Sequence, residues 1–163
     1  MGNGKLKNQE NLTEFEKDIL KQEIDLVDKA VARIDEIQMR LKNWCIAVWG
    51  GSLFLVAKDL GNPPYLILLT AVVPVLFGIS DIIWAKQMLI VNFREEKISN
   101  FINEGQEDPR FTLLDPIAKR YQDDPVFQSR TSMVKAMVHK GIWMFYLSLM
   151  FISIMLGIFL LMK

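Results

Sequence analysis

The stretch that decides the fold is GIWMFYLSLMFISIMLGIFLLM, residues 141–162, which contains no charged side chain. As an α-helix it would be about 33 Å long, enough to cross a hydrocarbon layer of roughly 30 Å. Its Leu, Ile, Met and Phe residues fall on every face, whereas a soluble helix normally keeps a polar face. We therefore predict a transmembrane helix here, with Trp143 and Tyr146 at a membrane interface.

Upstream, residues 44–57 read WCIAVWGGSLFLVA and also carry no charge. This segment is short for a membrane span. Lys42 and Lys58 flank it, and their aliphatic stems can lengthen the apolar segment while their ammonium groups stay in water. We predict a first transmembrane helix here.

A third apolar segment, residues 65–85, reads YLILLTAVVPVLFGISDIIWA, and its one charge is Asp81. The connecting residues 58–64, KDLGNPP, form a turn-rich run that is too short for a domain. The simplest prediction is a helical hairpin of two transmembrane helices over residues 43–85.

Basic residues predict the orientation of these helices. Residues 1–42 hold eight Lys and Arg and residues 86–140 hold nine, whereas the opposite side has Lys58 and Lys163. By the positive-inside rule, the N-terminus and the long loop are cytoplasmic and the C-terminus is outside. The prediction is a multi-pass protein of the inner (plasma) membrane.

The overall composition excludes several classes of protein. The 19 Lys and Arg balance 19 Asp and Glu, which argues against nucleic acid as a partner. One cysteine, Cys45, excludes an internal disulfide framework, and one histidine, His139, excludes a site with paired His ligands. No nucleophile elbow, P-loop or nucleotide fingerprint occurs, so we expect no enzyme, no metal and no cofactor.

Residues 12–42 carry an amphipathic, heptad-like pattern with apolar residues spaced 4, 3, 4 and 3. The members of this stripe are Leu20, Ile24, Val27, Val31 and Ile34. Thr13 and Glu16 match a capping box that would start the helix, which then runs unbroken into the first span. The sequence favours two interpretations of the stripe equally. It packs on the chain's own second cytoplasmic helix, or it forms a coiled-coil contact between protomers.

The second span should continue as a cytoplasmic helix to residue 104, capped by Gly105. Residues 106–131 are then broken by prolines, the first two being Pro109 and Pro116. Because this loop also holds several large apolar side chains, we expect it to pack across the cytoplasmic helices, with a partner-contact site as the alternative. Residues 132–140 lead as a helix into the third span.

Asp81 is the most informative single residue, because an ionisable group inside a span is expensive and often functional. We expect it at about the depth of Trp44 and Cys45. It is either an interfacial carboxylate, solvated or paired with Lys42 or Lys86, or a residue that lines a polar path or gate.

Gly50 and Gly51 lie in the middle of the first span, where small residues allow helices to approach closely. Tight packing of the hairpin or contact within an oligomer is the favoured use, and a hinge is the alternative. Pro74 should kink the second span. With Asp81, these three residues are the candidate pore or gate positions.

Two stretches carry a family resemblance: RIDEIQMRLKNWCIAVWGGSLFLVAKD, residues 33–59, and LILLTAVVPVLFGISDIIWAKQMLIVNFRE, residues 66–95. Their plan resembles the SLATT-type effectors of bacterial conflict and antiphage systems, including an Asp at the end of the second span and a following Phe-Arg-Glu. The resemblance covers residues 33–104, and the third span and the proline-broken loop are additions. It implies an oligomeric effector that permeabilises or depolarises the inner membrane, released by a cytosolic sensor protein.

These observations predict an all-α integral membrane protein with three transmembrane helices. Its expected parts are a coiled-coil-like cytoplasmic helix, the hairpin, a cytoplasmic extension and a third span, at residues 1–42, 43–85, 86–140 and 141–163. The expected partners are membrane lipids, further copies of the chain and a cytosolic sensor. A non-enzymatic pore-forming or depolarising effector is the first hypothesis, and a membrane anchor or scaffold that docks a soluble partner is the alternative.

Overall fold

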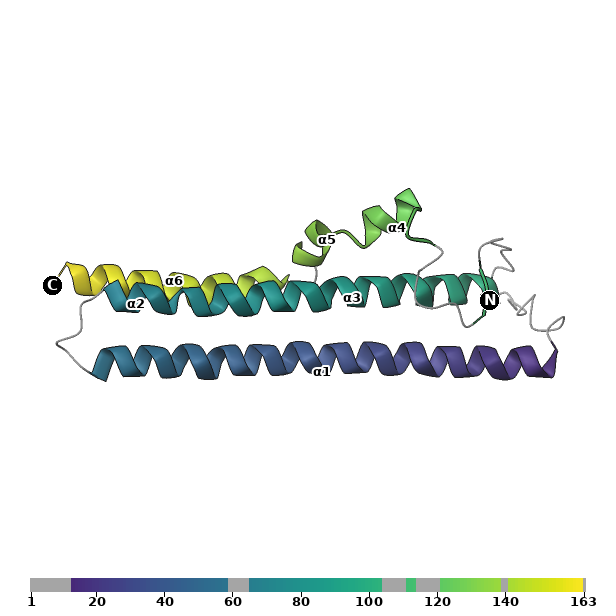
Figure 1. The fold of residues 1–163 in the computed structure, drawn as a ribbon, viewed down its shortest axis with the longest axis horizontal. Helices are drawn as coiled ribbons and strands as arrows, with labels where there is room; N and C mark the ends of the chain where they lie inside the picture. Colours follow the sequence, from purple (N-terminus) through teal and green to yellow (C-terminus); the bar gives the residue numbers. More distant parts are fainter. Residues whose placement is uncertain (1–12, 59–64, 104–110, 114–120, 139–140, 163) are drawn as a thin grey trace, which may run out of the picture. The chain divides into compact units, whose positions relative to one another are not determined.

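The computed structural model describes residues 13–58, 65–103, 111–113, 121–138 and 141–162, and these hold helices and no strand. The helices are α1 (Glu14–Lys58), α2 (Tyr65–Thr70), α3 (Val72–Asn103), α4 (Pro125–Arg130), α5 (Met133–Val138) and α6 (Ile142–Leu161) (Figure 1). The all-α prediction is confirmed. The predicted turn at 59–64, the cap at Gly105, the breaks at Pro109 and Pro116, and His139 lie outside the described residues.

The chain divides into two compact units. Unit 1 comprises residues 1–34 and 86–132, and unit 2 comprises residues 35–85 and 133–163. Helices α1 and α3 each contribute to both units, because each is a single long helix that runs past the boundary.

Helix α1 begins where the capping box predicts. The Thr13 backbone N–H donates to Glu16 Oε2 at 2.8 Å, and the Glu16 N–H donates to Thr13 Oγ1 at 3.3 Å. These two bonds satisfy donors that have no partner inside a helix. From there α1 continues without a break to Lys58, as predicted.

The second apolar segment is interrupted at Ala71, between α2 and α3. The cause is Pro74, whose ring collides with the carbonyl four residues earlier, that of Thr70, and which has no N–H to give it. The Ala71 N–H instead bonds to Leu68 O, three residues back, at 3.1 Å. The predicted distortion by Pro74 is therefore present, one turn ahead of the proline.

In unit 1 the stripe of α1 packs within the chain. Leu20, Val27 and Ile34 are buried, while Ile24 and Val31 are half-buried. A groove lies between α1 and α3, lined by Ile24, Val27 and Asp28 of α1 and by Glu95, Ile98, Ser99, Ile102 and Asn103 of α3. Of the two uses expected for the stripe, packing on the chain's own helix is the one that the structure shows.

The described parts of the loop between α3 and α4 also pack on unit 1. Tyr121 and Phe127 contact the ring of Phe93 edge-on, with centroids 5.4 and 5.1 Å away. Phe111 stacks on Phe101 at 4.6 Å. These aromatic contacts agree with the expectation that the loop packs on the cytoplasmic helices.

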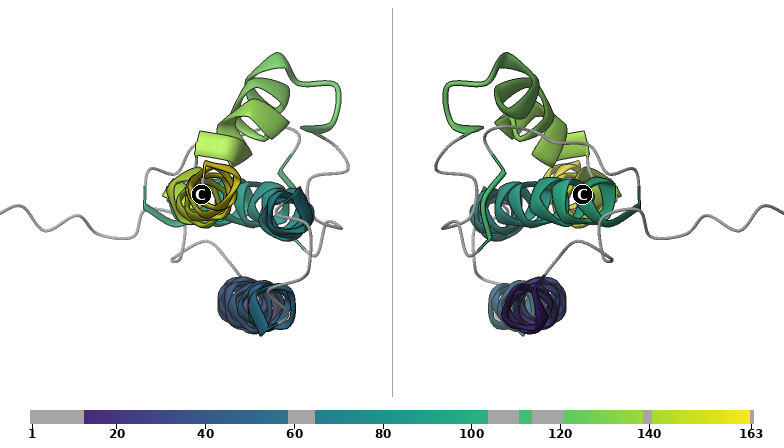
Figure 2. Two further views of the ribbon diagram at one scale, coloured as in Figure 1. Left: turned by 90° about the vertical axis from the view of Figure 1, so that its left-hand side faces the viewer. Right: turned by 90° about the vertical axis from the view of Figure 1, so that its right-hand side faces the viewer.

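In unit 2 the second half of α1 and helices α2, α3 and α6 lie side by side (Figures 1 and 2). Helix α6 starts at Gly141, whose φ of 63° favours glycine. Two glycines bring α6 close to its neighbours: a Cβ at Gly157 would lie 2.5 Å from Leu68 of α2, and one at Gly78 would lie 3.3 Å from the ring of Tyr146.

By length and composition, two parts of the described chain are apolar enough to cross a membrane, one within Leu66–Asn103 and one that ends with α6 at Leu161. They overlap the second and third predicted spans. The predicted first span lies in α1, which does not meet the same criterion. The structure thus supports two of the three spans by this measure.

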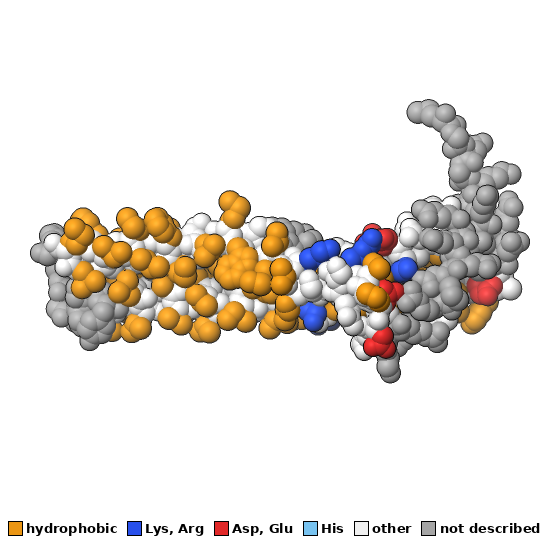
Figure 3. Space-filling model, turned by 90° about the horizontal axis from the view of Figure 1, so that it is seen from above, with side chains coloured by type: hydrophobic (Ala, Val, Ile, Leu, Met, Phe, Trp, Pro, Cys, Tyr) orange, Lys and Arg blue, Asp and Glu red, His pale blue; other side chains and the backbone are white. Residues whose placement is uncertain are grey.

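Exposed apolar side chains gather on unit 2. Among the residues that the structure describes, 30 large hydrophobic side chains are exposed, and 27 of these belong to unit 2, whereas Phe15, Leu26 and Val126 belong to unit 1. On the face drawn in Figure 3, hydrophobic side chains cover α6 and its neighbours in unit 2. Soluble monomers rarely expose an apolar surface this extensive.

Candidate functional site

Asp81, on α3, is fully buried, with 0% of its surface exposed. Its Oδ2 accepts a hydrogen bond from the hydroxyl of Tyr146 on α6 at 3.1 Å. Its backbone carbonyl accepts one from Nε2 of Gln38 on α1 at 3.5 Å. Its Oδ1 is buried without a hydrogen-bond partner. Asp81 therefore links α3 to α6 through its carboxyl group and to α1 through its backbone carbonyl, and one carboxyl oxygen has no hydrogen bond.

One expectation for Asp81 needs correction. A solvated carboxylate is wrong, because the side chain is buried. The expected pairing with Lys42 or Lys86 and the expected depth near Trp44 and Cys45 stay predictions. A role in a path or gate stays a prediction.

Tyr146 is buried against Gly78, which leaves room for its ring. Its position at a membrane interface stays a prediction. Its side chain points back along α6, as helical side chains do, so its hydroxyl reaches Asp81 one turn further along α3. A buried phenol normally requires such a partner.

A second polar cluster joins α1, α2 and α6. The indole N–H of Trp49 on α1 donates to Ser153 Oγ on α6 at 2.8 Å. Thr70 Oγ1, at the end of α2, lies 3.1 Å from Ser153 Oγ and 2.6 Å from the carbonyl of Ile67. The Ile67 carbonyl, which the Ala71 N–H leaves without its helical donor, therefore accepts a hydrogen bond from the Thr70 hydroxyl.

Each cluster takes one residue from α1, one from α2 or α3, and one from α6. Gln38 and Trp49 are eleven residues apart on α1, and so are Thr70 and Asp81 along α2 and α3, so the helices hold one antiparallel register. In a membrane, hydrogen bonds between helices contribute about 0.6 kcal/mol each. Sequence reasoning missed Gln38 and Ser153, although a Gln in register with the α1 stripe and a hydroxyl in an apolar span were visible signals.

The four candidate pore or gate residues do not form one site. Asp81 and Pro74 are buried within unit 2. A Cβ added at Gly50 or Gly51 would meet nothing within 4 Å, so these glycines are not required for close packing of the hairpin. Contact of Gly50 and Gly51 with another chain, and their use as a hinge, stay predictions.

Unit 1 contains a buried ion pair that sequence reasoning did not predict. Arg94 of α3, 2% exposed, binds Glu23 of α1, with 2.7 Å from its Nε to Glu23 Oε1. It also donates to the carbonyl of Thr112 at 2.8 Å, and its guanidinium lies 4.7 Å from the centroid of the Phe111 ring. The signal in the sequence was an acid, Glu23, three residues after Leu20 in the apolar stripe.

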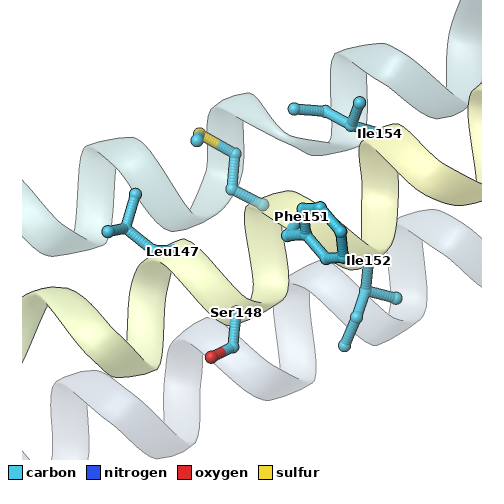
Figure 4. Close-up of a pocket in the computed structure, with 6 residues that line it drawn as sticks. Leu147, Ser148, Phe151, Ile152 and Ile154 are labelled. Atoms are coloured by element: carbon cyan, nitrogen blue, oxygen red, sulfur yellow. The ribbon is translucent and has the colours of Figure 1, made fainter.

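Among the cavities, one is a surface hollow whose lining residues all come from α6: Leu147, Ser148, Met150, Phe151, Ile152 and Ile154 (Figure 4). Its one polar side chain, Ser148, donates to the carbonyl of Met144 at 2.6 Å. The hollow therefore offers an apolar surface and no reactive group.

The described residues contain no group of three or more His, Cys, Asp or Glu side chains that is arranged to hold a metal. Comparison with protein-family models, with curated proteins and with solved structures finds no match to this chain. The functional argument therefore depends on where the chain places its polar and apolar side chains.

Proposed function

We propose that this chain is an integral membrane protein with three transmembrane helices, and that it acts as a non-enzymatic, homo-oligomeric effector that permeabilises or depolarises the bacterial inner membrane in antiphage defence. The observation that supports it is the arrangement of unit 2. Polar side chains such as Asp81, Trp49 and Ser153 point inward, and large apolar side chains are exposed on α1, α3 and α6. A lipid environment stabilises this arrangement and water does not.

The first span is supported by exposure as well as by sequence. On α1, Trp44, Phe54 and Leu55 are 65%, 67% and 69% exposed. Helices α3 and α6 expose apolar side chains in the same way. If α1 lay outside the membrane, these side chains would face water, at a cost of roughly 25 cal/mol for each Å² of apolar surface.

Cysteine labelling decides between three spans and two. In a Cys45→Ala background, Lys21→Cys, Lys58→Cys and Met162→Cys are introduced singly, and intact spheroplasts are treated with a membrane-impermeant maleimide. Three spans with the N-terminus inside predict labelling at 58 and 162, and at the exposed position 21 only after permeabilisation. If only α3 and α6 span, positions 21 and 58 lie on the same side and label alike, and the three-span proposal is wrong.

The small number of spans in one chain supports an oligomeric effector. In unit 2, α1, α3 and α6 contact one another through side chains, so a path for ions would form between copies rather than inside one. The test is inducible expression in bacteria with a membrane-potential dye, where we expect depolarisation and loss of growth. Full tolerance and an unchanged potential, even with the neighbouring genes present, would refute it.

A matched control uses the exposed face of α6. Phe151 and Met155 are exposed, so replacing both with lysine disturbs no internal contact. A lysine near the centre of a span opposes insertion by about 2.5–3.5 kcal/mol. We expect the double variant to leave the membrane potential unchanged at equal expression.

A second candidate function, a membrane anchor for a soluble partner, is favoured by the groove in unit 1. Its rim carries the charged residues Asp28 and Glu95. If the groove docks a partner, Asp28→Lys with Glu95→Lys should abolish co-purification of a stoichiometric soluble protein. Asp18→Lys, at an exposed position of α1 outside the groove lining, is the control.

A further inference from the structure

The short helix α5 exposes large apolar side chains on its outer face. Ala136 has none of its surface exposed, so this position faces the rest of the chain. Val134 and Val138 lie about 160° around the helix from Ala136, and they are 69% and 76% exposed. A helix at the surface of a soluble protein has the reverse arrangement, with its large apolar residues inward and its polar residues outward. Water is therefore a poor neighbour for the outer face of α5.

Helix α5 is attached to the part of the chain that the proposed function places in lipid. It belongs to unit 2 and packs on α6, whose first residue, Ile142, comes four residues after Val138. In the first turn of α6, Trp143 and Met144 are exposed as well. Exposed apolar side chains therefore continue from α5 into the start of α6, and Trp is a residue that favours a membrane interface.

The charges in this part of the chain favour an anionic neighbour. All 19 Asp and Glu residues lie within residues 1–124, whereas residues 125–163 contain no acid and four basic residues, Arg130, Lys135, Lys140 and Lys163. Lys135 is exposed on α5 itself. A second copy of α5 would bring another positive charge and no acid, so two copies of this face repel each other. Anionic lipid headgroups, in contrast, attract basic residues that lie next to a membrane helix.

We propose that α5 binds the anionic headgroup layer of the membrane, with Val134 and Val138 inserted among the lipids and Lys135 beside phosphate groups. Interfacial helices bind in this way, with apolar side chains at the boundary between headgroups and acyl chains. The aliphatic stem of a lysine can follow the apolar surface while its ammonium group reaches the phosphates. This inference rests on the proposed function, because it requires α6 to span the membrane.

Fluorescence quenching by lipids tests the contact directly. In a Cys45→Ala background, Val134→Cys and Val138→Cys are labelled singly with a nitrobenzoxadiazole dye, and the full chain is reconstituted into vesicles of phosphatidylcholine and phosphatidylglycerol. The quencher is a spin label near the headgroup end of the lipid acyl chains. The control is Val126→Cys in α4, which is also exposed but belongs to unit 1. We expect about threefold stronger quenching at 134 and 138 than at 126.

Two results would overturn the inference. One is quenching at 134 and 138 that does not exceed quenching at 126, which would mean that the outer face of α5 lies outside the lipid. The other is a label at 134 and 138 that neither the lipid quencher nor aqueous iodide reaches, which would mean that protein covers this face. Because both side chains are exposed, replacing either one disturbs few contacts within the chain.

A second comparison tests the charge of the headgroups. In vesicles of phosphatidylcholine alone, we expect quenching at 134 to fall to about half, because the attraction of Lys135 for anionic lipid is lost. Lys135→Gln in the mixed vesicles should have the same effect. Lys21→Gln, at an exposed position of α1 in unit 1, is the matched control and should change nothing. Equal quenching in both kinds of vesicle would refute the role of anionic headgroups.

Failure of this inference and failure of the proposed function give different results. Phe151→Cys, exposed near the centre of α6, is labelled in the same way and is tested with a spin label at the methyl end of the acyl chains. Quenching at 151 without quenching at 134 and 138 would refute the binding of α5 and leave the membrane span standing. No quenching at any of these positions would refute the span, and the proposed function with it.

Discussion

At the scale of single residues, Arg94 is notable because its charged side chain is buried in unit 1. Its charge is removed from water and is balanced by Glu23, the Thr112 carbonyl and the face of Phe111. One nitrogen, Nη1, is buried without a partner. Desolvation of such a pair costs about as much as the attraction returns, so the pair specifies how α1, α3 and residue 112 meet more than it adds stability.

Replacing Arg94 alone should therefore destabilise the protein more than replacing Arg94 and Glu23 together. We expect Arg94→Met to destabilise the protein by about 3–5 kcal/mol, because Glu23 is left buried and uncompensated. The double change with Glu23→Leu should recover most of that loss, as measured by unfolding in detergent. Arg130→Met, which breaks the half-exposed pair with Glu96, should cost less than about 1 kcal/mol and serves as the control.

Asp81 supports a prediction about permeation. Asparagine matches its shape and can still accept from Tyr146, so Asp81→Asn should leave assembly unchanged. It removes an ionisable group at the meeting point of three helices, so the conductance of the reconstituted protein should change. An unaltered conductance in planar bilayers would count against a gating role.

At the scale of elements, the start of α1 depends on pH. Hydrogen bonds from the Thr13 backbone and hydroxyl lower the pKa of Glu16 below its ordinary value of 4.5. The cap is therefore complete above that value and is lost as the pH falls through the lowered pKa. Hydrogen exchange should show the first turn fraying at pH 3 and not at pH 6, and Glu16→Gln should weaken this dependence.

The packing of α6 on α2 depends on Gly157. Leu68 occupies the place of its missing side chain, so Gly157→Leu should overpack the contact and cost about 1–3 kcal/mol. Gly51→Leu is the matched control, since helix propensity changes equally and nothing lies nearby. Equal melting temperatures for the two variants in detergent, as monomers, would contradict the packing described here.

At the scale of the whole molecule, the uneven surface predicts how the protein behaves in preparation. Because 27 of the 30 exposed large hydrophobic side chains in the described residues lie on unit 2, we expect the chain to sediment with membranes and to resist alkaline carbonate extraction. It should dissolve only with detergent. Release into the soluble fraction by carbonate would show that unit 2 does not span a membrane.

Much of the helical organisation could be predicted from local signals. The cap at Thr13, the unbroken course of α1, the disturbance ahead of Pro74 and the length of α6 each depend on a few neighbouring residues. The candidate site could not be predicted in the same way. Asp81 was recognised as a charge in an apolar segment, but its partners Gln38 and Tyr146 are 43 and 65 residues away in sequence.

The sequence by itself determined where the helices lie and which segments are apolar, because helix caps, prolines and the spacing of charges act within a turn or two. Only the tertiary structure decided the register between helices, and with it the burial of Asp81 and the pairing of Arg94 with Glu23, and it also decided the exposure of Val134 and Val138. Register depends on side chains from distant segments fitting together. A shift by one turn moves a residue about 5 Å, which separates a hydrogen bond from an unpaired group.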